Sequence, residues 1–375
     1  MRRHPRRRTP ARTLLWQGLL LAAVAGAALY LAGNARANLA ARGITFGFAF
    51  LATPAGFDIP FRIPAWSTSD TYARALWVCL VNTLLVSALA IATGSLLGLL
   101  LGIMRLSANW LVRNVALWVV ELVRNTPQLV QLVFWYAGVL QALPPVRQSL
   151  DLPLGSFLNV RGLFLPWPVL APGLGWLTPA LAASVLLLPA LWLTHVRGRQ
   201  VGAKALVLPL TLLIAFALAL RGVNHPALQG FNFRGGVVLP PELVALWLGL
   251  SVYASAFVAE IVRGSIEAVP KGQREAARSI GLRPGPELLL VVLPQAMRTM
   301  VPPLTSQYLN IVKASTLGAA VAYPEIVQIF AGTVLNQSGR AIEVMLIVMG
   351  VFLVVSLAVS ALMNWYNRRV LFEER

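Results

Sequence analysis

The sequence has few charged residues, a single cysteine and three histidines. Only 12% of its 375 residues are charged, and soluble domains carry roughly twice that share. Cys79 has no second cysteine to pair with, which excludes an internal disulfide and a cysteine metal site. The histidines are scattered, and we predict no metal site. The sequence also lacks the G-x-x-x-x-G-K-[ST] phosphate loop, so the chain cannot bind ATP through that motif.

Hydrophobic residues make up 58% of the chain, and several apolar runs are long enough to cross a bilayer. The formal net charge is +18, but the basic residues flank these runs and do not form a separate basic domain. A membrane protein is therefore favoured over a nucleic-acid-binding protein. No segment alternates in the manner of an outer-membrane barrel. We predict an all-α integral membrane protein with about eight transmembrane helices.

The predicted spans are separated by connections that differ in charge. The spans are 14–33, 77–104, one within 107–143, 177–195, 203–220, 241–263, 303–321 and 343–364. The connections predicted to lie outside are 34–75, 143–176, 221–240 and 322–341. Most lysines and arginines fall on the opposite side, which by the positive-inside rule is cytoplasmic. Both termini are therefore predicted to be cytoplasmic.

Two of these spans leave alternatives open. The arginine-rich start and Ala35-Arg36-Ala37 are compatible with a cleaved signal peptide. The apolar run 14–33 is long for a signal peptide, however, and we favour an uncleaved span. Pro127 is expected to kink or restart the third helix, because proline cannot donate a backbone hydrogen bond. Either 111–142 is one kinked span, or an interfacial helix precedes a span near 126–142.

Short patterns predict contacts between segments. Gly94, Gly98 and Gly102 recur every four residues in the second span, a spacing that lets another helix approach closely. Two weak internal repeats are also present: Glu121-Leu-Val-Arg124 with Glu260-Ile-Val-Arg263, and Asn159-Val-Arg161-Gly162 with Asn232-Phe-Arg234-Gly235. Matches this short arise by chance, so they serve only as hints.

The polar stretch 264–298 interrupts the apolar pattern and is predicted to lie inside. Good helix formers from Glu275 lead to Gly281, where glycine can end a helix in the left-handed conformation. Arg283-Pro284-Gly285-Pro286 is expected to prevent a helix and form a turn. A second helix should then begin near Pro286 and run to Pro294.

This stretch resembles the cytoplasmic loop of the membrane-spanning permease subunits of bacterial ABC importers, written E-A-A-x3-G-x9-I-x-L-P. The matching residues are Glu275, Ala276, Ala277, Gly281, Leu293 and Pro294. Val291 stands where isoleucine is usual, a mild departure. The resemblance implies that Glu275, Ala276, Ala277, Arg278, Gly281 and Pro294 couple this chain to a separate ATPase.

Two further segments resemble the polar amino-acid permeases of the histidine/glutamine type. They are residues 120–132, which include Glu121-Leu-Val-Arg124 and Pro127, and Ala259-Glu260-Ile-Val-Arg263-Gly264. This family implies a five-helix core of type I importers, made of the second, third, sixth, seventh and eighth spans. Residues 76–370 would form the permease domain, with 143–240 inserted and 1–75 added before it.

The inserted segment points to a subclass. Phe157-Leu-Asn159-Val-Arg161-Gly162 and Phe231-Asn232-Phe-Arg234-Gly235-Gly236 resemble the larger general L-amino-acid and glutamate/glutamine/aspartate/asparagine permeases. The resemblance implies a transport subunit of the bacterial inner membrane, with no catalytic residues and no cofactor of its own. The implied partners are a cytoplasmic ATPase dimer that holds ATP and magnesium, a second and homologous permease, and a periplasmic amino-acid-binding protein. The chain would also contact the lipid bilayer and no nucleic acid.

Two groups of residues are candidates for the transport path. Ser306, Asn310 and Lys313 lie within about 60° on an ideal helix. A lysine inside a span is costly, and Lys313 could either meet a substrate carboxylate or be satisfied by backbone carbonyls or a partner. Thr316 and Asn82 are weaker candidates, and Asn82 could simply bond across helices.

The two Glu-x-x-Arg pairs have two interpretations. Glu121 with Arg124 and Glu260 with Arg263 could each pair within one helix. Alternatively, they form cross-helix pairs at a cytoplasmic gate.

Two other functions compete with an ABC permease. An ion-coupled secondary transporter would have acidic residues within its spans, whereas here the acids lie at span edges. Lys313 and the ordered loop argue against a purely structural membrane protein. The sequence does not identify the amino acids that are carried, and it does not decide whether the second permease is an identical chain or a homologue, although a homologue is favoured.

Overall fold

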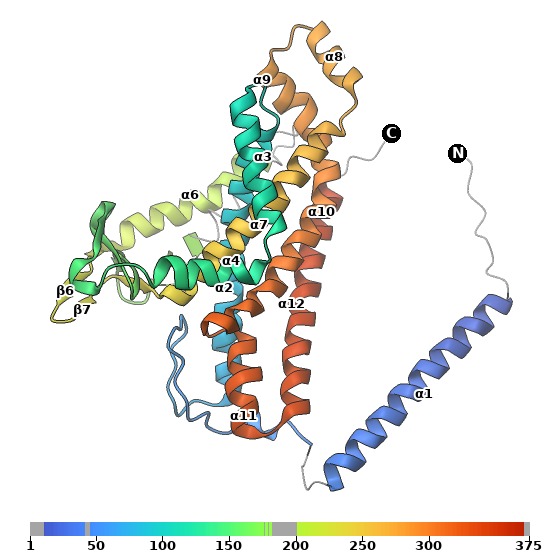
Figure 1. Cartoon of the computed structure of the whole chain (residues 1–375), viewed down its shortest axis with the longest axis vertical. Helices are drawn as coiled ribbons and strands as arrows, with labels where there is room; N and C mark the ends of the chain where they lie inside the picture. The colour runs from blue at the N-terminus through green and yellow to red at the C-terminus, as the bar shows by residue number, and fades with distance from the viewer. Residues whose placement is uncertain (1–10, 42–45, 176, 179, 182–200, 371–375) are drawn as a thin grey trace.

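Long helices dominate the computed structural model, which describes residues 11–41, 46–175, 177–178, 180–181 and 201–370 (Figure 1). The α-helices are α1 (Ala11–Ala41), α2 (Tyr72–Arg105), α3 (Trp110–Asn125), α4 (Gln128–Val133), α6 (Val201–Ala219), α7 (Pro241–Glu267), α8 (Lys271–Ser279), α9 (Pro284–Pro286), α10 (Leu293–Ala314), α11 (Leu335–Ser338) and α12 (Ala341–Val370). Three π-helical segments extend them, η2 (Phe134–Leu140), η5 (Glu287–Val292) and η7 (Val327–Val334). The 3-10 segments are η1 (Ala49–Ala52), η3 (Val146–Gln148), η4 (Pro153–Gly155) and η6 (Ser315–Val321).

Four helical stretches among the described residues are long and apolar enough to cross a membrane. They are α2, α7, the run Pro284–Val321 and α12 through Asn367. Shorter apolar helices lie at Leu15–Leu31, Gln128–Leu140 and Leu210–Ala219. The chain is thus a multi-pass membrane protein, while the count of eight spans and the side of each terminus stay predictions. Most of the predicted span 177–195 lies outside the described residues.

The helix α7 is central to the bundle. It packs against α2, α3, α4 and α10, and α10 in turn packs against α12. Its contact with α2 confirms the glycine prediction: a Cβ on Gly98 would lie 2.5 Å from the Cβ of Val258 and 2.8 Å from the carbonyl oxygen of Ser255. Gly94 and Gly102 are buried on the same face of α2. The two backbones approach closely only because these positions lack side chains.

The expected break at Pro127 is present. The helix α3 ends at Asn125 and α4 begins at Gln128, so residues 110–140 form two helical pieces. A proline at the start of α4 loses no hydrogen bond, because the first backbone N–H groups of a helix have no partner within it.

Residues 322–341, which the sequence predicts to be an external connection, contain a helix that the sequence did not predict, while their side of the membrane stays a prediction. Ala322 takes the left-handed conformation (φ 59°), and a new helix of η7 and α11 then runs to Ser338. Its residues Ile326, Phe330 and Val334 are buried in one cluster with Cys79 of α2 and Val344 of α12. The segment alternates short apolar groups with polar residues, so it looked too short and too polar for a span.

The expectation of an all-α fold is wrong in the inserted segment, which contains short strands. They are β1 (Leu150–Leu152), β2 (Ser156–Asn159), β3 (Gly162–Leu165), β4 (Trp167–Leu170), β5 (Leu220–Asn224), β6 (Ala227–Gln229), β7 (Asn232–Arg234) and β8 (Val237–Leu239). A four-stranded antiparallel sheet has the order β1-β2-β3-β8, and β4-β5 and β6-β7 form separate pairs. In Figure 1 this insert and α6 project to one side of the helical bundle.

The helix α1 stands apart from the bundle in Figure 1. Each of its side chains whose burial is described is exposed. The segment after it packs instead at the α11 end of the molecule, where Phe50, Ile59 and Trp66 join the cluster with α12. Gly47 anchors it: its N–H donates to Glu343 (3.0 Å), and its carbonyl accepts from Arg340 (3.1 Å).

Candidate functional site

The polar loop predicted from the sequence is built around α8, at one end of the molecule (Figure 1). Two hydrogen bonds end this helix: the N–H of Gly281 donates to the Arg278 carbonyl (2.9 Å) and that of Leu282 to the Ala277 carbonyl (3.1 Å). This is the Schellman arrangement, and it needs the left-handed backbone that Gly281 adopts at φ 83°. The predicted glycine cap is confirmed.

The exposed surface of α8 is small and combines a charged side chain with apolar ones. Glu275 and Ala276 are exposed, and Ile280, directly after the helix, has 77% of its surface exposed. The side chain of Glu275 has no hydrogen bond or ion pair to any described residue. Ala277, by contrast, is buried against its own chain. Of the two alanines in the motif, only Ala276 is therefore accessible to a partner.

Side-chain contacts hold α8 against its neighbours. Two nitrogens of Arg278 donate hydrogen bonds to the carboxylate of Glu287, at 2.8 and 3.3 Å. This carboxylate raises the pKa of Arg278 above its usual value through hydrogen bonding, so the guanidinium stays charged. Arg274 donates to the Ile266 carbonyl at the end of α7 (2.9 Å). The helix α8 is thereby tied both to α7 and to the long helix that follows.

The long helix begins earlier than the sequence predicts. Arg283-Pro284-Gly285-Pro286 was expected to exclude helix, but the helical run begins at Pro284 and continues to Val321. Proline is compatible with the first helical position, where its missing N–H has no partner to lose. The run passes through Pro294, Pro302 and Pro303, and η5 ends at Val292, directly before α10 begins at Leu293. The stretch 282–298 is thus mostly helix.

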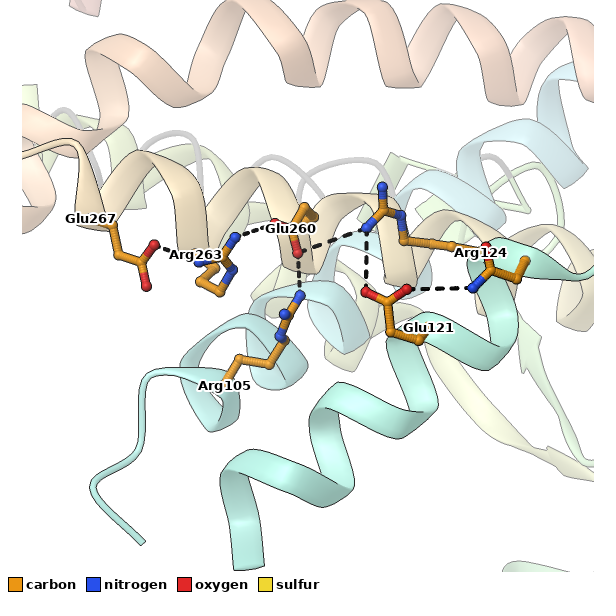
Figure 2. A network of polar contacts seen from close by, with 7 residues as sticks. Arg105, Glu121, Arg124, Glu260, Arg263 and Glu267 are labelled. Carbon is orange, nitrogen blue, oxygen red and sulfur yellow. Dashed lines mark hydrogen bonds and ion pairs between the residues drawn. The ribbon is translucent and has the colours of Figure 1, made fainter. Parts of the chain in front are cut away.

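The two Glu-x-x-Arg pairs come together in one charge network (Figure 2). Glu260 on α7 pairs with Arg263 one turn along and, across the helix interface, with Arg105 at the end of α2. Arg124 on α3 lies 4.0 Å from Glu260 and 3.8 Å from Glu121. One carboxylate therefore links α2, α3 and α7, and Glu267 pairs with Arg263 at the edge.

Sequence reasoning missed Arg105 in this network. It looked like the charge that ends the second span, yet its side chain is only 11% exposed and faces Glu260. The available signal was charge balance: three arginines at one end of the bundle require acidic partners. Ion pairs occur both within helices and across helices, while a role of these pairs in a cytoplasmic gate stays a prediction.

Polar residues on α10 line up along an exposed face. Ser306, Asn310 and Lys313 are all exposed, as their helical spacing predicts. The side chain of Lys313 has no hydrogen-bond or ion-pair partner among the described residues. Thr316, just beyond, is half-buried and donates to the Lys313 carbonyl (2.8 Å). We call Ser306, Asn310 and Lys313 the polar stripe.

Asn82 does not belong to this exposed face. It is fully buried and donates to the carbonyls of Phe61 (2.9 Å) and Pro324 (3.0 Å). The neighbouring Thr83 accepts the N–H of Ile326 (3.3 Å). Asn82 thus satisfies irregular backbone at the start of the η7 helix, as in the cross-helix bonding that the sequence left open.

A second polar group between helices was not predicted. The hydroxyl groups of Thr93 on α2 and Ser251 on α7 lie 2.5 Å apart, and Trp247 donates to Thr93 (3.0 Å). Nearby in sequence, Ser95 and Tyr308 of α10 share a hydrogen bond of 3.0 Å. Ser, Thr and Tyr inside an apolar bundle bond across helices because no water can serve them. The described residues contain no group of three His, Cys, Asp or Glu that could hold a metal ion.

Comparison with known proteins finds a matching family model and relatives that align over nearly the whole chain. Residues 94–372 match the family model described as binding-protein-dependent transport system inner membrane component. The putative amino-acid ABC transporter permease protein YhdX of Escherichia coli is 48% identical, over 97% of this chain and 95% of the relative.

Two other full-length relatives bear on the subclass. The general L-amino acid transport system permease protein AapQ of Rhizobium johnstonii is 42% identical, over 97% of this chain and 93% of the relative. The glutamate/glutamine/aspartate/asparagine transport system permease protein BztB of Rhodobacter capsulatus is 37% identical, over 98% and 95%. The subclass predicted from the inserted segment is confirmed.

Proposed function

The chain belongs to the family of binding-protein-dependent transport system inner membrane components, and from this premise we propose that it is the permease subunit of an ATP-driven importer of polar L-amino acids. The family match favours this function over an ion-coupled secondary transporter. The names of the relatives support amino acids as the substrate class. A subunit of this kind carries no catalytic residues, and ATP and magnesium would be held by a partner.

The observation that best supports a role in coupling is that α8 has an exposed surface and is also bonded to two membrane helices. Its exposed surface offers Glu275, Ala276 and Ile280, while Arg274 and Arg278 tie it to α7 and to the Pro284–Val321 run. A partner that moved α8 would therefore move two membrane helices. We assign this surface to a cytoplasmic ATPase dimer, which places the chain in the bacterial inner membrane with α8 on the cytoplasmic side.

A second permease completes the proposed path. The polar stripe on α10 is exposed along the apolar bundle, and Lys313 lacks a counter-charge within the described residues. Facing a second permease of homologous sequence, the stripe would line a polar passage in which Lys313 meets the substrate carboxylate. The cost of an isolated lysine in a membrane, ~2.5–3.5 kcal/mol on insertion scales, favours such a partner.

The Glu260 network supports a gate near the ATPase. It joins the ends of α2, α3 and α7 through ion pairs that are partly exposed, so a moderate rearrangement can break them. ATP-driven movement of α8 would shift the end of α7 and change these pairs. The two arrangements would differ in their ion-pair contacts, as a two-state switch requires.

Purification of the assembled transporter tests the proposal. The chain is co-expressed with its ATPase and second permease, reconstituted in nanodiscs and mixed with solute-binding protein and single amino acids. We expect a stable complex whose ATP hydrolysis rises only when the binding protein carries a polar L-amino acid. Uptake into proteoliposomes that follows an ion gradient and needs no ATP would instead support the secondary transporter.

A further inference from the structure

The inserted segment ends in an exposed patch of two arginines and a phenylalanine, which we call the basic knob. Phe231, in the turn between β6 and β7, has 75% of its surface exposed. The guanidinium of Arg147 lies 4.8 Å from the centre of its ring, and Arg161 donates to its carbonyl oxygen (3.4 Å). Figure 1 places the β6–β7 hairpin at the far tip of the insert, away from α10 and α12.

A small aromatic core holds the knob in place. Phe233 of β7 stacks on Phe157 of β2 with ring centres 4.5 Å apart and lies 5.0 Å from Phe164 of β3. These rings bury Val146, which directly precedes Arg147. The two segments of the insert that indicate the subclass, 157–162 and 231–236, therefore meet here, and each contributes one of the stacked phenylalanines. The knob is presented by packed strands, so little order must be gained when a partner binds.

Tight glycine turns support the same geometry. Gly162 opens β3 at φ 123°, and a Cβ there would lie 2.2 Å from the Leu239 carbonyl oxygen. Gly236 has φ 63°, and its Cβ would lie 2.3 Å from the Leu165 carbonyl oxygen. Only glycine allows these strands to approach, so the backbone around the knob has little freedom to rearrange.

The insert is unusually basic for the side on which we place it. Within 143–175 and 220–240 the acidic residues reduce to Asp151, against Arg147, Arg161, Arg221 and Arg234. All five side chains are exposed. Basic residues are normally depleted outside the membrane. Arginines kept there on an ordered surface therefore call for an anionic counterpart.

We propose that the basic knob is a docking contact for an acidic face of the soluble binding protein that delivers substrate to this permease. The inference rests on the proposed function, because it places the insert on the side opposite α8. Phe231 would be the apolar anchor, and Arg147 and Arg161 would pair with carboxylates around it.

The chemistry of the knob favours a protein over a lipid surface. Arginine and aromatic residues are enriched where protein interfaces gain most of their affinity. Aromatic anchors at membrane surfaces are instead mainly tryptophan and tyrosine, and anionic-lipid sites carry clusters of four to eight basic residues on the cytoplasmic side. Opposite charges across the contact would also speed encounter between the two proteins.

Binding kinetics on the reconstituted complex test this inference. The probe is the purified solute-binding protein that stimulates ATP hydrolysis by the wild-type complex, captured on nanodiscs without anionic lipid. The variants are Phe231→Ala and the pair Arg147→Glu with Arg161→Glu. Arg221→Glu is the control, because it reverses one arginine on β5 of the same insert, half the charge change of the pair.

The two knob variants should weaken binding through different rate constants. Charge reversal should slow association by about tenfold at low salt, with less effect at high salt, because steering is screened. Phe231→Ala should chiefly speed dissociation, by about tenfold, because an apolar anchor acts after encounter. Both should keep the basal ATP hydrolysis of the wild type, while Arg221→Glu should bind nearly as the wild type does.

Three outcomes contradict the proposal in recognisable ways. Unchanged binding in both knob variants, with a stimulated wild type, overturns the docking contact and leaves the proposed function intact. If Arg221→Glu slows association as much as the charge-reversed knob does, the effect comes from the overall charge of the insert. That result also overturns the docking contact. An effect that appears only when anionic lipid is added would assign the knob to lipid headgroups. A wild-type complex that no binding protein stimulates would count against the proposed function itself.

Discussion

At the scale of single residues, Glu260 is the most connected charge in the described part of the chain. It contacts arginines on three helices, Arg105, Arg124 and Arg263. Removing it would leave these cations with only Glu121 and Glu267 as ion-pair partners among the residues that the structure describes. Because its side chain is about one third exposed, solvent moderates the loss.

The substitution Glu260→Gln should therefore loosen the gate without unfolding the protein. An interaction of about 1 kcal/mol shifts a two-state equilibrium by ~5-fold, so ATP hydrolysis without the binding protein should rise by about that factor. Glu121→Gln is the control, because Glu121 contacts only Arg124 and Asn125 in the network. A Glu260→Gln complex that stays tightly regulated would show that the network is purely structural.

Lys313 carries the prediction for the transport path. Lys313→Gln keeps a long polar side chain but removes the charge, and uptake of amino acids with a free α-carboxylate should fall by about tenfold, as expected for one charge-assisted hydrogen bond. Complex assembly, followed by gel filtration, should be unchanged. Lys313→Arg should restore much of the uptake. Normal uptake in the Lys313→Gln variant would remove this residue from the path.

At the scale of elements, α8 depends on its ion pair between Arg278 and Glu287, which we call the brace. Glu287 is buried and Arg278 is largely exposed, so the carboxylate depends more on the pair than the guanidinium does. Breaking such a pair leaves a buried charge without compensation. The brace should therefore matter for transmitting movement from α8 to the Pro284–Val321 run.

A double-mutant cycle tests the brace. Arg278→Ala and Glu287→Ala should each reduce ATP hydrolysis stimulated by the binding protein several-fold, and the double variant should lose little more than either alone. Arg283→Ala is the matched control in the same loop, because its side chain is exposed and has no ion pair among the described residues. Additive losses would mean that the two residues act independently.

The elements also show what the sequence can predict. Hydropathy and caps located α2, α7, α12, the break at Pro127 and the Gly281 turn, because each depends on residues close together in the chain. The strands of the insert were missed because they are three to five residues long, and β1, β5 and β6 are exposed throughout. The η7 helix was missed because its stability comes from Thr83 and other distant residues.

In the candidate site, too, features set by neighbouring residues were predicted, and features set by distant contacts were not. The coupling motif was predicted residue by residue from its spacing, but the inward orientation of Ala277 depends on packing against the following helix. Both Glu-x-x-Arg pairs were predicted, whereas Arg105 joins them only through the α2–α7 contact. Contacts between distant residues have no local signature in one sequence.

At the scale of the whole molecule, the proposed function places α8 and the insert on opposite sides of the membrane. The sequence offers a clean test, because Cys79 is its single cysteine and is buried. In a Cys79→Ala background, Lys271→Cys and Leu154→Cys each introduce a thiol at an exposed position. A membrane-impermeant maleimide should label Leu154→Cys in spheroplasts and Lys271→Cys only after the membrane is permeabilised. Labelling of both positions from one side would contradict the topology.

The hydrogen bond from Asn82 to the Pro324 carbonyl has a consequence for biosynthesis. It joins residues that are 242 positions apart. At ~5–20 residues per second, roughly 10–50 seconds of translation separate their emergence from the ribosome. Throughout that interval the amide of Asn82 lacks this acceptor, and the α11 end of the protein cannot close. A nascent chain that stops before Pro324 would therefore leave one N–H of the Asn82 amide in α2 without its acceptor, while the other N–H can still donate to the Phe61 carbonyl.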